Sequence, residues 1–130
     1  MFENLGIFSM AQAMATHSAA RQAVIAGNVA NADTPGYRAR DLASFGETFR
    51  ANATGALHAT RPGHDLTRPD EPARQAQAVH RPNAAAPNGN TVSLEQEMFA
   101  AAEAKGEHDR ALAIYRSAMT ILRSSVGGRG

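Results

Sequence analysis

The positions of the prolines divide this chain of 130 residues into three parts. All six prolines fall between residues 35 and 87, so residues 1–34 and 88–130 contain none. Proline in a helix interior removes a hydrogen bond and clashes with the preceding turn, so long helices can form only in the two terminal parts. We therefore predict an all-α fold, with two long terminal helices on either side of a proline-rich middle.

The N-terminal part is predicted to be one helix from about residue 2 to residue 31. It contains only two side chains that are charged at neutral pH, Glu3 and Arg21. Two rows of uncharged residues run along it, each with helical spacing. The first row is Leu5, Phe8, Gln12, Ala15, Ala19, Gln22, Ala26 and Val29, and the second is Ile7, Ala11, Met14 and Ile25. One partner helix cannot cover both rows, so we expect other subunits to cover the remainder.

A turn is predicted where this helix ends. Proline disfavours helix at the residue before it, here Thr34, and Gly36 can supply the positive φ that a type II turn needs. Beyond the turn, three large apolar side chains recur at helical spacing, namely Leu42, Phe45 and Phe49. They predict a short amphipathic helix that docks against the long one.

The second long helix is predicted to begin at a capping box formed by Ser93 and Gln96, after a turn at residues 88–89. Glu95 and Glu97 favour this start, because negative charge stabilises a helix N-terminus. The main row of the helix alternates steps of four and three, which is coiled-coil periodicity. It consists of Leu94, Met98, Ala101, Lys105, His108, Leu112, Tyr115, Met119, Leu122 and Val126. Two glycines, 127 and 128, predict its end.

The middle segment, residues 51–91, holds only three large aliphatic side chains, Leu57, Leu66 and Val79. So little apolar surface cannot offset the entropy of ordering, and we expect the segment to be flexible in the free monomer. Acidic residues are interleaved with its evenly spaced arginines, and no aromatic side chain lies between them for base stacking. We interpret Arg61, Arg68, Arg74 and Arg81 as a solvated, charge-balanced linker.

Three regions follow from these patterns. Residues 1–50 form the long helix, the turn and the short helix, residues 51–91 the flexible middle, and residues 92–130 the C-terminal helix. We expect the two long helices to pair as an antiparallel coiled-coil hairpin and to form one domain together.

No catalytic, cofactor or metal site can be assembled from the sequence. The chain has no cysteine, and a net charge of +1 gives it no drive toward nucleic acid. The acidic and histidine side chains of the middle segment, His58, His64, Asp65 and His80, match no metal-ligand spacing. A small hydrolase built on them would need an ordered pocket, for which this segment has too few apolar residues. We expect no enzymatic activity, no cofactor, no small-molecule substrate and no nucleic-acid partner.

Several stretches resemble one known family. The sequence GNVANADTPGY at 27–37 is similar to the signature of flagellar rod and hook proteins, in which an Asn-rich helix end runs into a Thr-Pro-Gly-Tyr turn. The stretches RARD at 38–41, NGNTVSLE at 88–95 and AIYR at 113–116 resemble a rod member in particular. The residues that match the signature are Asn28, Asn31, Thr34, Pro35, Gly36 and Tyr37. From the pattern alone, Asn28 and Asn31 fit equally well as ordinary polar residues at a helix end.

The resemblance implies a structural subunit of the proximal rod of the flagellar basal body, required for motility. Such a subunit is exported unfolded by the flagellar type III apparatus without a cleaved leader and assembles in the periplasm. Its partners are other copies of itself, other rod proteins, and the adaptor and membrane-ring components of the basal body. The alternatives are another rod subunit of the same family, or a soluble helical adaptor or export chaperone that binds a partner in its hairpin groove.

The expected assembly seam follows the helical rows. It consists of Leu5, Phe8, Ala15, Ile25, Val29, Met98, Leu112, Tyr115, Met119, Leu122 and Val126. The sequence leaves two roles open for its C-terminal members, since they could form the core of a lone hairpin, a contact between subunits, or both.

Overall fold

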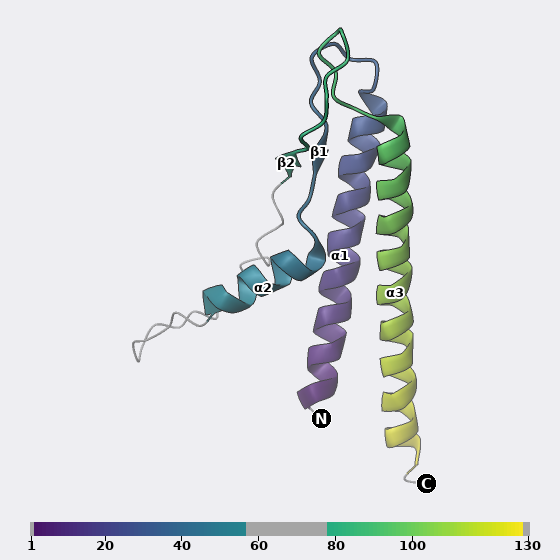
Figure 1. Cartoon of the computed structure of the whole chain (residues 1–130). Coiled ribbons are helices and arrows are strands. Elements are labelled where there is room, and N and C mark those ends of the chain that lie inside the picture. Colours follow the sequence, from purple (N-terminus) through teal and green to yellow (C-terminus); the bar gives the residue numbers. More distant parts are fainter. Residues whose placement is uncertain (1, 57–77, 129–130) are drawn as a thin grey trace.

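Two long antiparallel helices dominate the structure, a computed structural model that describes residues 2–56 and 78–128, without the side chains of 2–5 and 51–56. The elements are α1 (Phe2–Ala30), β1 (Arg40–Asp41), α2 (Phe45–Ala56), β2 (Val79–His80) and α3 (Leu94–Gly127). Figure 1 shows α1 and α3 side by side, with both chain ends at one end of the hairpin, the open end. The turns that follow α1 and precede α3 lie at the other end, the closed end. The predicted all-α hairpin is confirmed.

Side-chain hydrogen bonds cap the N-termini of α2 and α3. The hydroxyl of Ser93 accepts a hydrogen bond from the Gln96 N–H at 3.5 Å, which caps α3 as predicted. At α2, Ser44 and Glu47 form a reciprocal capping box, each side chain accepting from the other's N–H at 3.3 Å. The short amphipathic helix is therefore present, and it runs from Phe45 to Ala56.

Small side chains fill the contact between α1 and α3. The residues buried there, which we call the buried row, recur at steps of three, four or seven residues on each helix. On α1 they are Ala11, Ser18, Ile25 and Asn28, and on α3 they are Glu97, Ala100, Ala104, Ala111 and Ala118. Ile25 packs with Ala100 and Ala104 in the hydrophobic core.

Each residue of the buried row on α3 comes one position before a member of the predicted row. Met98 and Leu112 of the predicted row are exposed, whereas the residues just before them, Glu97 and Ala111, are buried. Alanine accounts for the shift, because its short side chain lets two helix backbones approach closely where a leucine or methionine would hold them apart. On α1, the second predicted row, which includes Ala11 and Ile25, faces α3.

A short antiparallel ribbon packs against α1. Arg40 pairs with His80 and Asp41 with Val79, so β1 and β2 join at the point where the chain leaves the hairpin and returns to it. The Nε2 atom of His17 bonds to the Ala43 carbonyl at 2.8 Å, which holds the start of α2 against α1. The rest of α2 extends away from the hairpin (Figure 1).

We expect Ala104→Leu to lower the free energy of unfolding by about 1–3 kcal/mol, because Ala104 is fully buried between the helices and a larger side chain has no space. Urea unfolding followed by circular dichroism measures the change. Ala102→Leu is the matched control, since Ala102 is exposed on the same helix and should shift stability by less than about 0.5 kcal/mol. Equal midpoints for the two variants would contradict the close helix contact.

Candidate functional site

The signature turn closes the end of α1. The Tyr37 N–H donates to the Thr34 carbonyl at 3.2 Å, and Gly36 has a φ of 73°, as the predicted type II turn requires. Before it, the Asn31 side-chain amide donates to the Gly27 carbonyl at 2.8 Å, and the backbone N–H of Asn31 donates to the same carbonyl at 3.2 Å.

Asn28 joins the turn to three parts of the chain. Its side chain is completely buried, and its amide donates to the Arg40 carbonyl at 2.7 Å while its oxygen accepts from the Arg40 N–H at 3.1 Å. The same amide also donates to Glu97 Oε2 at 3.1 Å, and the oxygen accepts from the Tyr37 hydroxyl at 3.3 Å. Asn28 is thus no ordinary polar residue at a helix end, because its carboxamide pairs with the backbone at Arg40 as another strand would.

Asn90, like Asn28, joins separate parts of the chain at the closed end through its buried side chain. It is 4% exposed, and its amide donates to the carbonyls of Asn31 and Thr34 at 2.9 and 2.8 Å. Its oxygen accepts from the Val92 N–H at 2.8 Å, just before α3 begins. Asn90 lies in a stretch that resembles the family, but the sequence predicts no role for it, because its partners lie 56 and 59 residues away in the chain.

Two glycine turns meet back to back at this end. The Gly36 N–H donates to the Asn88 carbonyl at 3.0 Å, and the Thr91 N–H donates to the Tyr37 carbonyl at 3.0 Å. Gly89 has a φ of 82°, and a Cβ atom there would lie 3.4 Å from the Gly36 Cα. Positive φ at both positions favours glycine, so the pair of contacting turns requires glycine at both 36 and 89.

A chain of ion pairs ties the ribbon to both helices. Arg81, next to β2, contacts Glu97 at 2.6 Å and Asp41 at 2.8 Å. Asp41 in turn contacts Arg21 at 3.2 Å, and Arg21 contacts Glu103 of α3 at 3.0 Å. The side chain of Glu97 is fully buried, so its charge depends on Arg81 and on the amide of Asn28.

The interpretation of Arg81 as part of a solvated linker is wrong. Its side chain is only 15% exposed, and its N–H also donates to the Ala39 carbonyl at 2.8 Å. The spacing of the arginines carried no sign of this, because both carboxylates that hold Arg81 come from other parts of the chain. Arg61, Arg68 and Arg74 lie outside the described residues, as does most of the segment predicted to be flexible, for which flexibility stays a prediction.

The ion pairs shift the titration of Asp41 and Arg21. Burial by itself raises the pKa of Asp41, but the hydrogen bonds from Arg21, Arg81 and the Leu42 N–H outweigh it, so this pKa lies below its ordinary value. Burial lowers the pKa of Arg21, but Asp41 and Glu103 outweigh that effect and raise it. Both groups are therefore charged in the folded chain at neutral pH.

The predicted assembly seam divides into buried, half-buried and exposed members. Ile25 is buried, and the half-buried members are Phe8, Ala15, Met119 and Leu122. The exposed members are Val29, Met98, Leu112, Tyr115 and Val126, with Met98 at 73% and Val126 at 69%. The ring of Phe8 meets that of Tyr115 edge to face at 5.2 Å, and the Leu5 side chain lies outside the described residues. Met98 is therefore not core of a lone hairpin.

Two outer rows lie on one side of the hairpin. Most of their members follow a residue of the buried row by one position, which is about 100° round the helix. Because the helices are antiparallel, both outer rows point to the same side. The contacts of Arg21 to Asp41 in the ribbon and of His17 to Ala43 before α2 use the other side. The outer row of α1 is Gln12, Ala15, Ala19, Gln22, Ala26 and Val29, and that of α3 is Met98, Lys105, Leu112, Met119 and Val126.

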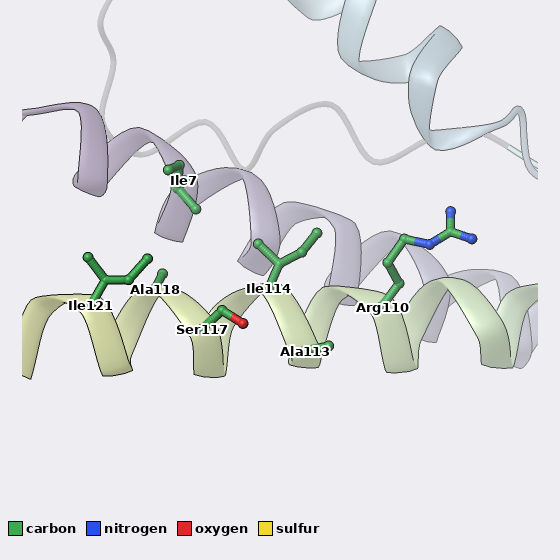
Figure 2. Close-up of a pocket in the computed structure, with 7 residues that line it drawn as sticks. All are labelled: Ile7, Arg110, Ala113, Ile114, Ser117, Ala118 and Ile121. Atoms are coloured by element: carbon green, nitrogen blue, oxygen red, sulfur yellow. The ribbon is translucent and has the colours of Figure 1, made fainter.

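Enzymatic and metal chemistry finds no support in the described part of the chain. No three His, Asp or Glu side chains among residues 2–56 and 78–128 are placed to hold a metal ion. His80 is exposed in β2, and His58, His64 and Asp65 lie outside the described residues. A shallow groove near the open end is mostly apolar, as Figure 2 shows, with Ile7, Ile114, Ala118 and Ile121 beside Arg110, Ala113 and Ser117. None of these side chains forms an acid–base pair.

No helix of the described residues is both long enough and apolar enough to span a membrane.

Known proteins resemble the chain along both helices. Residues 11–38, which run from α1 through the signature turn, match the model of a family described as flagella basal body rod protein. A flagellar basal body rod protein FlgB of Cereibacter sphaeroides is 31% identical over 109 residues, 83% of this chain and 84% of the relative. FlgB of Agrobacterium fabrum is 29% identical over 123 residues, 92% of each chain. FlgB of Yersinia enterocolitica is 32% identical over 117 residues, 85% of this chain and 80% of the relative.

We expect Arg81→Ala to destabilise the chain by roughly 3 kcal/mol, because it leaves the charge of the fully buried Glu97 without its cation. Urea unfolding measures the loss, and Arg116→Ala, at an exposed site on α3, should change stability by less than about 0.5 kcal/mol. Adding Glu97→Gln to Arg81→Ala should recover part of the loss, since a neutral amide oxygen still accepts from Asn28. No recovery would mean that the unpaired charge is not the cause.

Stability should also fall in acid through Asp41. Because the pKa of Asp41 is lower in the folded chain than its ordinary value of 3.8, its stabilising contribution is fully present above that value. The contribution is lost as the pH falls through the folded-state pKa. Urea midpoints measured from about pH 7 to about pH 3 should therefore decline at the acid end, and decline less in Asp41→Asn. Parallel profiles for the two proteins would exclude this origin.

Proposed function

Because the chain belongs to the FlgB family of flagellar basal body rod proteins, we propose that it is a structural subunit of the proximal rod that assembles through its two terminal helices. The relatives that support this carry the name of rod proteins and match the chain over most of its length. The observation within the molecule that carries the proposal is the outer row of α3, where the chain's own fold leaves Met98, Leu112 and Val126 exposed.

The exposed outer rows are suited to contacts between helices of neighbouring subunits. Met98, Leu112 and Val126 offer large apolar side chains at a spacing of fourteen residues, which keeps them on one face of α3. The outer row of α1 beside them is made of alanine, glutamine and valine and has no charged member. The one charged member of the two outer rows, Lys105, is paired with Asp109 at 3.0 Å, so a helix from another subunit could cover this surface without burying an unpaired charge.

The closed end supports a structural role in a different way. Its buried hydrogen bonds and ion pairs hold the ribbon and both helices in one arrangement, so the subunit would present the outer rows in a fixed geometry. We assign no enzymatic activity to the chain, in keeping with a family named for a structural part of the basal body.

The remaining features of the proposal come from the family resemblance. The subunit is proposed to leave the cytoplasm through the flagellar type III export apparatus without a cleaved signal peptide and to assemble in the periplasmic rod. Its proposed partners are other copies of itself, other rod proteins, and the adaptor and membrane-ring components of the basal body. Flagellum-dependent motility is proposed to require it.

Leu112→Asp tests the assembly seam in cells that lack the native gene. We expect the variant to fold, since Leu112 is 38% exposed, but to leave cells non-motile because a charge enters the contact between subunits. Swimming in soft agar and electron microscopy of isolated basal bodies measure the outcome. Leu122 is a poorer choice, because it is half-buried within the hairpin and an aspartate there would also destabilise the fold.

Ser117→Asp is the matched control, at an exposed position about 140° round α3 from Leu112. Cells with this variant should swim. Export of Leu112→Asp, detected in the periplasmic fraction, separates an assembly defect from a failure to leave the cytoplasm. Normal rods and motility with Leu112→Asp would refute the seam, and complete rods in cells that lack the gene altogether would refute the proposed function.

A further inference from the structure

The closed end contains the one Asn-Gly pair of the sequence, Asn88-Gly89. Such a pair can deamidate when the backbone nitrogen of the glycine attacks the side-chain carbonyl carbon of the asparagine. A bond forms between that nitrogen and Cγ, the bond from Cγ to Nδ2 breaks, and ammonia leaves with the proton that the nitrogen gives up. Water then opens the cyclic imide to aspartate or isoaspartate. Glycine permits the attack because it has no side chain to shield its nitrogen.

The fold engages both groups that this reaction needs. The Gly89 N–H donates to the Ala86 carbonyl at 2.8 Å, so the attacking nitrogen is held in a turn. The Asn88 side-chain oxygen accepts from the Asn90 N–H at 3.1 Å, which fixes the carboxamide that would be attacked. The Asn88 carbonyl accepts from the Gly36 N–H at 3.0 Å, so the signature turn fixes the backbone between the two groups.

We propose that Asn88 is a modification site that the fold protects, and that it deamidates when the closed end of the hairpin is open. Both Asn88 and Gly89 are exposed, so water can reach them in the folded chain. Protection therefore comes from the three hydrogen bonds and not from burial. In an unfolded chain these bonds are absent and the pair reacts freely.

The two products differ in what they do to the fold. Aspartate at position 88 keeps a side-chain oxygen that can accept from the Asn90 N–H. Isoaspartate adds a methylene to the main chain and so displaces the carbonyl that binds Gly36. The turn at Gly89 is also in contact with the signature turn, since a Cβ atom on Gly89 would lie 3.4 Å from the Gly36 Cα, so the added methylene displaces a backbone that packs against residues 34–37. A chain that forms isoaspartate while unfolded therefore loses the closed end of the hairpin.

Incubation of the purified full chain at neutral pH, in buffer and in concentrated urea, tests the proposal. Circular dichroism first shows that the chain in buffer is helical. Peptide mass spectrometry then measures deamidation at Asn88, and an isoaspartyl methyltransferase label separates the two products. We expect deamidation at Asn88 to be at least about tenfold slower in buffer, since every tenfold corresponds to about 1.4 kcal/mol of opening free energy. In urea, Asn88 should react faster than Asn83 and Asn90.

Equal rates at Asn88 in a helical chain and in urea would overturn the proposal, as would a faster reaction at another asparagine in urea. Gly36→Ala strains a positive φ and should bring the rate in buffer toward that in urea. Gly106→Ala is the matched control, because a Cβ atom there meets nothing within 4 Å, and it should leave the rate unchanged. Asn88→Asp should keep the urea midpoint of the unmodified chain, and a large loss would contradict the role given to the side-chain oxygen.

Discussion

The buried carboxamide of Asn28 is the contact on which the closed end of the hairpin depends. It pairs with both backbone groups of Arg40 and donates to Glu97, whose charge is fully buried. Glu97 then needs Arg81, and Arg81 brings the strand β2 back against β1 through Asp41. A buried network of this kind is stable only when each member has its partners, so it selects one arrangement of helices and ribbon.

The alanines between α1 and α3 leave the hairpin with a small hydrophobic core. They allow the two helices to approach closely, but they bury little apolar surface, and Ile25 is the large aliphatic residue in the cluster that they form. The larger side chains of α3, such as Met98 and Leu112, consequently point to the outside. The hairpin therefore keeps little of its apolar surface for its own stability and leaves much of it for other chains.

The two sides of the hairpin thus have different roles. One side binds the ribbon through hydrogen bonds and ion pairs, which fix the geometry of the chain. The other side has the two outer rows, which no element of the described chain covers. This division links the fold to the proposed role of a subunit, because a rod needs rigid members whose contact surfaces face their neighbours.

The sequence by itself determined the two helices, their antiparallel pairing and the turn at the end of α1. Proline positions, the cap at Ser93 and the Thr-Pro-Gly-Tyr turn act over a few residues, so local physics is sufficient to predict them. Which row of each helix faces the other was decided only in the tertiary structure, because a periodic pattern does not show whether alanine or leucine positions come closest. The roles of Arg81, Glu97 and Asn90 were likewise decided there. Each depends on partners far away in the chain, and only the folded arrangement brings those partners within hydrogen-bonding distance.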